Sequence, residues 1–195
     1  MPERDDMSTT ALLIIDMQKV YFTDPQLKRT QNSLVDSTNQ LIAMAHRCEM
    51  PIFNIRTEHT HSPATWTITM RDDEQGYLFK GSEQVENIPG LELSDTIDLV
   101  KTRDSAFYAT NLTPMLHNYG IDTVILCGVS TQSCIAQSAS DAFAADFHAI
   151  IARDAVASNR PEFEDVSLAI LRSEYRQEII TTRAIIKKMD QRKEK

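Results

Sequence analysis

The segment TVILCGVSTQSC, residues 123–134, decides the fold class of this chain. Its first five residues form an apolar, β-branched run, which is typical of a strand buried on both faces. Gly128 then marks a tight turn, and the small-residue run 135–143 that follows predicts a helix. A strand that leads through a turn into a helix is the repeating unit of a parallel α/β sheet.

Cys134 falls in the first turn of this predicted helix. The unpaired N–H groups and the positive end of the helix dipole stabilise an anion there. Such a position lowers the pKa of a cysteine from about 8.5 toward neutrality, and the thiolate is the nucleophilic form. The sequence therefore predicts a reactive thiol at Cys134.

The same alternation extends in both directions from this segment. Further strands are expected at 11–15, 52–56, 96–100, 147–152 and 178–180, and helices at 32–50, 111–119, 132–146, 161–175 and after 180. This pattern predicts an α/β protein with a three-layer αβα Rossmann-like fold around a mainly parallel six-stranded sheet. We expect a disordered tail over residues 1–9 and a single domain over 10–190.

Composition limits the function classes. The chain has 195 residues, a net charge of −8 and no basic patch, which argues against a nucleic-acid partner. No apolar run is long enough to span a membrane, and the polar N-terminus lacks a signal sequence. Three cysteines without metal-ligand spacing favour a reducing compartment. We therefore expect a cytoplasmic protein that uses neither nucleic acid nor membrane.

Three reactive side chains fall at the ends of predicted strands. Asp16 follows the first strand, Lys101 follows the third, and Cys134 follows the fourth across the turn. Taken alone, Asp16 is typical of a helix cap, Lys101 of a solvated surface and Cys134 of a core position. In open parallel sheets, however, ligands bind beyond the carboxyl ends of the strands. The joint placement therefore predicts a catalytic site made of all three.

Four segments carry a more specific resemblance: LLIIDMQ at 12–18, KTRDSAF at 101–107, GVSTQSC at 128–134 and DAVAS at 154–158. Together they resemble the motifs of the isochorismatase-like cysteine hydrolase superfamily, which includes nicotinamidases and N-carbamoyl amidases. The resemblance covers residues 10–180 approximately. The last of the four motifs would follow the fifth strand.

The resemblance implies a role for each residue. Asp16 would be the general base, Lys101 the electrostatic stabiliser, and Cys134 the nucleophile that forms a thioester. It also implies a cis peptide bond between Val129 and Ser130, with the N–H groups of Ser130 and Cys134 forming an oxyanion hole. The superfamily further implies a homo-oligomer, either a dimer or a tetramer.

The stretch 57–95 breaks the β/α rhythm, and a segment of that length is usually a lid or a binding loop. A passive surface excursion is the alternative. Substrate-binding candidates are residues in or near the motifs and this stretch: Gln18, Phe22, His59, Trp66 and Phe107, with Tyr77 as a further pocket wall. For the aromatic residues, ordinary core packing is the alternative. We expect Trp66, the only tryptophan, to line or close the pocket.

Nicotinamidases of the superfamily bind a metal through one Asp and two His after the second strand. The comparable segment here, 56–61, has His59 and His61 but no Asp at its start. We therefore predict no metal and no cofactor, and nicotinamide becomes a less favoured substrate. The cysteine favours hydrolysis of an amide or ureido/carbamoyl C–N bond in a small molecule. The alternatives are a vinyl ether hydrolase of the isochorismatase type and a non-catalytic binding protein that retains the fold.

Overall fold

A computed structural model describes residues 9–193 of the chain. The predicted disordered tail, residues 1–9, lies outside this range except for Thr9. The carbonyl oxygen of Thr9 accepts hydrogen bonds from the backbone N–H groups of Asp122 and Thr123, at 2.9 and 3.0 Å. Thr9 is therefore held against the start of β4, although the sequence analysis placed it in the predicted tail.

Six strands form one sheet in the order β3-β2-β1-β4-β5-β6, and every neighbouring pair is parallel. The strands are β1 Thr10–Ile15, β2 Ile52–Thr57, β3 Ile97–Lys101, β4 Thr123–Val129, β5 His148–Ala157 and β6 Glu178–Ile180. The sheet is thus wholly parallel where a mainly parallel sheet was predicted. Its order reverses between β1 and β4, which is where ligands bind in sheets of this kind.

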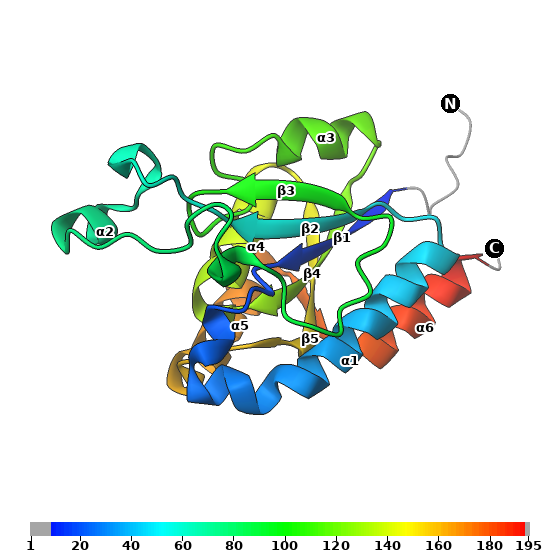
Figure 1. Ribbon diagram of the computed structural model, residues 1–195. Coiled ribbons are helices and arrows are strands. Elements are labelled where there is room, and N and C mark those ends of the chain that lie inside the picture. The colour runs from blue at the N-terminus through cyan, green and yellow to red at the C-terminus, as the bar shows by residue number, and fades with distance from the viewer. Residues whose placement is uncertain (1–8, 194–195) are drawn as a thin grey trace.

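Helices cover both faces of the sheet (Figure 1). They are α1 Pro25–Arg47, α2 Ile68–Asp72, α3 Leu112–Asn118, α4 Ala136–Ala144, α5 Pro161–Tyr175 and α6 Thr182–Lys193. Short 3₁₀ turns lie at Tyr21–Thr23, Pro63–Thr65 and Glu83–Val85, and one π-helical turn lies at Thr131–Ile135. The predicted three-layer αβα Rossmann-like fold is confirmed.

The alternation of side chains along the strands builds two cores. Leu13 and Ile15 of β1 point to the face covered by α3, α4 and α5, whereas Leu12 and Ile14 point to the face covered by α1 and α6. All four side chains are fully buried. This two-sided burial is the reason that β1 and β4 are unbroken apolar runs in the sequence.

Several elements differ in their bounds from the predictions, and α1, β5 and α6 have the clearest reasons. Helix α1 starts at Pro25, because the Asp24 carboxylate caps it by accepting hydrogen bonds from two backbone N–H groups of its first turn. Strand β5 continues to Ala157, so the motif 154–158 lies mostly within this strand and not after it. The described part of α6 extends to Lys193, beyond the predicted domain end.

The stretch after β2 is only partly irregular. An isolated β-bridge joins His59 to Phe79 and closes the base of an arm, residues 60–77, that contains α2. Figure 1 shows this arm projecting away from the sheet, past the ends of β2 and β3. None of the helices within residues 9–193 is long and apolar enough to cross a membrane.

Candidate active site

The carboxyl ends of three strands bring the predicted catalytic residues together. Asp16 follows β1 with a positive φ of 55°, which aspartate tolerates better than most residues. Lys101 is the last residue of β3, and Cys134 lies in the π-helical turn that follows β4. The three residues are far apart in sequence, and the parallel sheet order β3-β2-β1-β4 brings their strand ends to one edge.

The three side chains form a buried cluster around the Lys101 ammonium group. Its Nζ atom lies 2.7 Å from Oδ2 of Asp16 and 3.7 Å from Sγ of Cys134. It also donates to the carbonyl oxygen of Arg103 at 3.0 Å. Asp16, Lys101 and Cys134 are 0%, 1% and 6% exposed. A carboxylate, an ammonium and a thiol therefore share one site from which most water is excluded.

Thr57, the last residue of β2, completes this cluster, and the sequence reasoning missed it. Its hydroxyl donates to Oδ1 of Asp16 at 2.9 Å and accepts from Nζ of Lys101 at 2.8 Å. The Asp16 carboxylate is therefore held by a different partner on each oxygen. A threonine at the end of a strand is too common to stand out in a sequence.

Gln18 lies behind Thr57 and is enclosed by protein atoms. It is fully buried, and its Nε2 donates to the carbonyl oxygens of Thr57 and Val85, both at 3.0 Å. Its Oε1 accepts from the Thr57 backbone N–H at 2.8 Å. Because these backbone bonds occupy both donors, the prediction of Gln18 as a substrate-binding residue is replaced by a role in positioning Thr57.

Gly128 permits the close approach of β4 to β1 directly beside the cluster. It pairs with Ile15 and has a φ of 118°, and a Cβ atom placed on it would lie 1.9 Å from the Ile15 carbonyl oxygen. Any side chain here would push β4 away from the strand that carries Asp16. The next peptide bond, between Val129 and Ser130, is cis.

The π-helical turn Thr131–Ile135 carries Cys134 into helix α4. The Ile135 N–H donates to the carbonyl oxygen of Ser130 at 3.2 Å, which is the wide spacing of a π turn. Such turns are rare and occur mostly at functional sites. The role of the Ser130 and Cys134 N–H groups as an oxyanion hole remains a prediction.

The electrostatics of Cys134 differ from the sequence-based expectation. Burial raises the pKa of the Cys134 thiol well above its ordinary value, the Asp16 carboxylate raises it further, and Lys101 only partly opposes both effects. The expected lowering by a helix N-terminus is therefore wrong. The sequence could not reveal the raised pKa of Cys134, because the burial of this residue, which is 6% exposed, arises from tertiary packing. The resting residue is a neutral thiol that needs a base.

Lys101 is held in its charged form. Desolvation lowers its pKa, but the attraction of Asp16 and of Cys134 outweighs this, so the pKa of Lys101 lies above its ordinary value. A buried ion pair is weak support for stability, because desolvation of both charges offsets most of their attraction. Folding alone therefore does not account for Asp16 and Lys101 at this position.

Two tyrosines and one histidine border the cluster. Burial raises the pKa of Tyr21 well above its ordinary value, and the Asp16 carboxylate and the thiolate form of Cys134 raise it further, so the Tyr21 hydroxyl lies near both. Burial also raises the pKa of Tyr77, to which the Asp104 carboxylate adds, and the Tyr77 ring lies 6.5 Å from that of His59. The sequence reasoning missed Tyr21, since it lies in an irregular segment.

His59 is buried beside the cluster. Desolvation lowers the pKa of its imidazole, and the positive charges of Arg103 and Lys101 lower it further, so the ring is neutral at pH 7. Its Nδ1 atom is buried and has no hydrogen-bond partner among the described residues. Its place as a substrate-binding residue stays a prediction.

Two predicted aromatic residues, Phe22 and Phe107, pack away from the cluster. Phe22 is 4% exposed and packs in the core between the sheet and α1. Phe107 packs against Phe147, which precedes β5 at the opposite end of the sheet, with ring centroids 5.8 Å apart. Both are core residues, because the chain turns away from the strand ends before reaching them. The prediction that they line the substrate pocket is not supported by their contacts.

Trp66 stabilises the arm from within. Its Nε1 donates to the carbonyl oxygen of Thr60 at 2.9 Å, and its ring lies against Gly76 and Phe79. These contacts join the two sides of the arm, which Figure 1 shows extending away from the body. Trp66 thus holds the arm together from within, and its place at the substrate pocket stays a prediction.

The residues suited to metal binding do not converge. His61 stacks on Phe79 with ring centroids 4.2 Å apart, whereas His59 is buried under the arm. Over the described residues, no group of three or more His, Cys, Asp or Glu side chains could hold a metal ion. The ligand set of the metal-binding nicotinamidases therefore does not fit this chain.

Comparison with known proteins identifies the family. The Isochorismatase domain model matches residues 10–184, so the chain belongs to the isochorismatase family of hydrolases. It is 33% identical over 175 residues to maleamate amidohydrolase of Pseudomonas putida, covering 85% of this chain and 80% of the relative. It is 29% identical over 168 residues to a "Probable inactive nicotinamidase" of Arabidopsis thaliana, covering 82% and 86%.

A solved structure is similar over almost the whole chain. The cysteine hydrolase from Pseudomonas syringae pv. phaseolicola 1448A superposes with a TM-score of 0.83 and 25% sequence identity. The match covers 96% of this chain and 95% of the other. The fold of this chain therefore agrees with its membership of the isochorismatase family.

Proposed function

We propose that this protein is a cysteine amidohydrolase that hydrolyses a C–N bond of a small amide or ureido/carbamoyl compound through a thioester at Cys134. The observation that carries the proposal is the buried contact of one ammonium with both a carboxylate and a thiol, at 2.7 and 3.7 Å. Relatives that are named as amidohydrolases of maleamate and of ureidoacrylate support the bond type.

The first half of the reaction forms the thioester. The Asp16 carboxylate accepts the proton of the Cys134 thiol, which burial holds in its neutral form, and the sulfur attacks the carbonyl carbon. The N–H groups of Ser130 and Cys134 stabilise the resulting oxyanion. The C–N bond then breaks, and the leaving nitrogen takes the proton from Asp16.

The second half hydrolyses the thioester. Asp16 accepts a proton from a water molecule, whose oxygen attacks the thioester carbon. The C–S bond breaks, the acid product leaves, and the proton on Asp16 returns to the sulfur. Lys101 remains charged throughout and stabilises the thiolate, because its own pKa is raised at this site. The net reaction consumes one water and releases one amine or ammonia.

A panel of substrates tests this proposal. Purified protein is incubated with small amides, ureido and carbamoyl acids, nicotinamide and isochorismate, and ammonia or product release is measured. The proposal expects turnover of at least one C–N substrate and its loss in Cys134→Ala. Turnover of isochorismate that survives in Cys134→Ala would instead establish the vinyl ether hydrolase. Binding of a panel member without turnover would favour the non-catalytic alternative, which the relative named as inactive makes relevant.

We also propose that the protein works as a homo-oligomer on a small-molecule substrate. Helix α5 carries a stripe of exposed apolar side chains, Phe163, Val166 and Ile170, between 48% and 57% exposed. The arm adds Ile68, which is 66% exposed. Apolar patches of this kind commonly mark interfaces. Light scattering coupled to gel filtration, repeated on Val166→Lys and Ile68→Lys, tests this directly.

A further inference from the structure

The turn that carries Cys134 is not held by its own backbone bonds alone. The carbonyl oxygen of Ser130 is shared between the N–H groups of Ser133 and Ile135, at 3.1 and 3.2 Å. Ser130, at the start of the turn, makes no side-chain capping bond. Because the bonding of a π turn is wider than that of an α-helix, side-chain contacts from outside are needed to fix where Ser130 and Cys134 lie.

Two consecutive side chains of this turn are held from the junction between β5 and α5. Thr131, which is fully buried, donates from Oγ1 to Oε2 of Glu164 in the first turn of α5, at 3.2 Å. Gln132 accepts from the hydroxyl of Ser158, just after β5, at 2.6 Å. The same Ser158 oxygen accepts from the backbone N–H of Arg160 at 2.7 Å, which fixes its orientation. We refer to the contacts that Glu164 and Ser158 make with the turn as the junction clamp.

Glu164 is itself held by an arginine that a bulge of β5 presents. Opposite residues 126–128 of β4, strand β5 uses residues 151–156, which is three residues more. Arg153 lies in this bulge, and its guanidinium donates to Oε1 of Glu164 at 2.7 Å. Bulges often lie next to active sites, where they re-aim a side chain. Each oxygen of the Glu164 carboxylate therefore has its own partner, and Oε2 is the one that holds Thr131.

We propose that Glu164 and Ser158 are positioning residues of the catalytic site, which hold the turn so that the N–H groups of Ser130 and Cys134 face the developing oxyanion. This inference rests on the proposed function, and it gives the motif 154–158, to which Ser158 belongs, a part in the reaction. Both residues act through other side chains of the turn. Loss of either contact should therefore lower kcat and leave KM nearly unchanged, because alignment in the transition state is lost.

Turnover of the amide found in the substrate panel provides the first readout. Glu164→Leu removes the acceptor for Thr131, and Ser158→Ala removes the donor to Gln132. Each variant should lower kcat about tenfold and change KM by less than about threefold. Glu164→Gln keeps an oxygen acceptor at the same length and should recover most of kcat. Wild-type kcat in either Glu164→Leu or Ser158→Ala would overturn the proposal.

The accessibility of the thiol provides a second readout that needs no substrate. Cys134 is 6% exposed, so iodoacetamide reaches it only when the turn opens locally. Loss of either clamp contact should speed alkylation of Cys134 at least about threefold, as measured by mass spectrometry. Cys127 of β4 is fully buried and should keep its wild-type rate, since the strand does not depend on the clamp. Equal acceleration at both cysteines would reveal general destabilisation and refute a positioning role.

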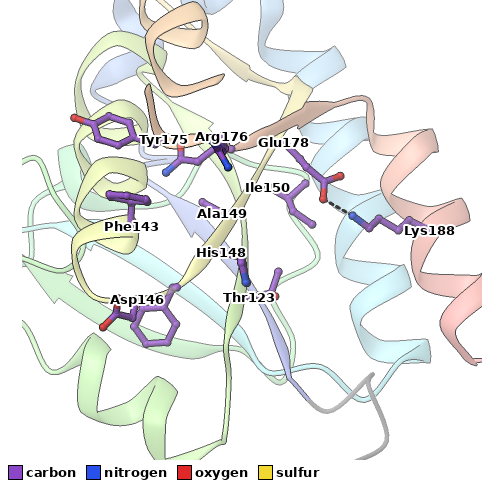
Figure 2. A pocket seen from close by; sticks show the side chains of 12 residues that line it. Thr123, Phe143, Asp146, His148, Ala149, Ile150, Tyr175, Arg176, Glu178 and Lys188 are labelled. Carbon is purple, nitrogen blue, oxygen red and sulfur yellow. Dashed lines mark hydrogen bonds and ion pairs between the residues drawn. The ribbon is translucent and has the colours of Figure 1, made fainter. Parts of the chain in front are cut away.

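Glu178→Leu is the matched control. Glu178 of β6 also forms an ion pair, with Lys188 of α6, but it borders a cavity at the opposite end of the sheet, where β4 and β5 begin (Figure 2). This variant should keep the wild-type kcat and the wild-type alkylation rate of Cys134.

The two readouts separate this inference from the proposed function. If the wild-type protein hydrolyses no C–N substrate while the clamp variants still speed alkylation of Cys134 alone, the proposed function fails and the positioning of the turn stands. Wild-type alkylation of Cys134 in Glu164→Leu and Ser158→Ala would overturn the clamp, whatever the substrate panel shows.

Discussion

The hydroxyl group of Thr57 can be removed without changing any charge in the catalytic cluster. Thr57→Val keeps the shape of the side chain but deletes the bond to Oδ1 of Asp16, at 2.9 Å, and the bond from Nζ of Lys101, at 2.8 Å. Both partners are charged and fully buried, so no water can replace the lost hydroxyl. The substitution therefore tests whether the cluster depends on this bridge.

The expected loss follows from the two bonds. A hydrogen bond to a charged group contributes about 1.5–3 kcal/mol, and the two bonds share one hydroxyl, so a loss of about 2–4 kcal/mol in unfolding free energy is expected. Activity should fall about 10- to 100-fold, mostly in kcat, because the carboxylate loses one of its two fixed partners. Urea denaturation and ammonia release from the amide found in the substrate panel measure the two effects.

Two control variants isolate the role of the bridge. Thr57→Ser keeps the hydroxyl and should recover most of the activity. Thr10→Val is the same substitution at a buried β1 position, 1% exposed, where the hydroxyl has no partner among the described residues, and it should be neutral or slightly stabilising. If Thr57→Val equalled the wild type in rate and stability, the bridge would be unimportant and the reasoning wrong.

Four further predictions concern other parts of the molecule. Asp16→Asn should lose at least about 100-fold in kcat, since an amide cannot accept the thiol proton, and wild-type rates would exclude Asp16 as base. Chelators should leave activity intact, and a measured loss that zinc or iron restores would contradict the absence of a three-ligand cluster among the described residues. Gly128→Ala should prevent folding or abolish ordered β4 pairing, as judged by circular dichroism, because its Cβ would meet the Ile15 carbonyl oxygen at 1.9 Å. Burial raises the pKa of Cys127 from 9.0 to about 12, so the unfolded state loses this proton first and stability should fall with rising pH between these values. Cys127→Ala should reduce that slope by about 1.4 kcal/mol per pH unit, and an unchanged slope would show that Cys127 is not responsible.

The fold could be predicted from the sequence because two-sided burial leaves a simple pattern. Strands such as β1 must be apolar at every position, and they recur between helical segments. Helix α5 was located at its true bounds, since Pro161 sits in its first turn. The start of α1 was missed because its first turns are largely polar. The capping residue Asp24 and the following Pro25 were the signals that a helix begins there.

The candidate site could be predicted only in part. Asp16 and Lys101 each directly follow a predicted strand and Cys134 follows another across a turn, and parallel strands place such residues at one edge. Thr57 and Tyr21 could not be found this way, because neither residue type indicates chemistry without its neighbours. The protonation of Cys134 depends on burial, which arises only when the chain folds.

The misplaced aromatic residues have a common physical cause. Phe22 and Phe107 lie close in sequence to Asp16 and Lys101, but Phe22 packs in the core beside α1 and Phe107 packs against Phe147. Trp66 lies in the stretch that was expected to form a lid, yet its indole N–H and ring are used to hold the arm together. Nearness in sequence to a catalytic residue thus does not by itself place a side chain at the cluster.

The central claim is a covalent thioester at Cys134, and partitioning with hydroxylamine tests it most directly. Hydroxylamine is added to the wild-type protein during turnover of its amide substrate, and the hydroxamate and free acid products are quantified. A thioester intermediate predicts that hydroxamate forms in proportion to hydroxylamine at the expense of the free acid, and that Cys134→Ala yields neither product. Free acid without hydroxamate at any concentration, or continued turnover by Cys134→Ala, would contradict the account.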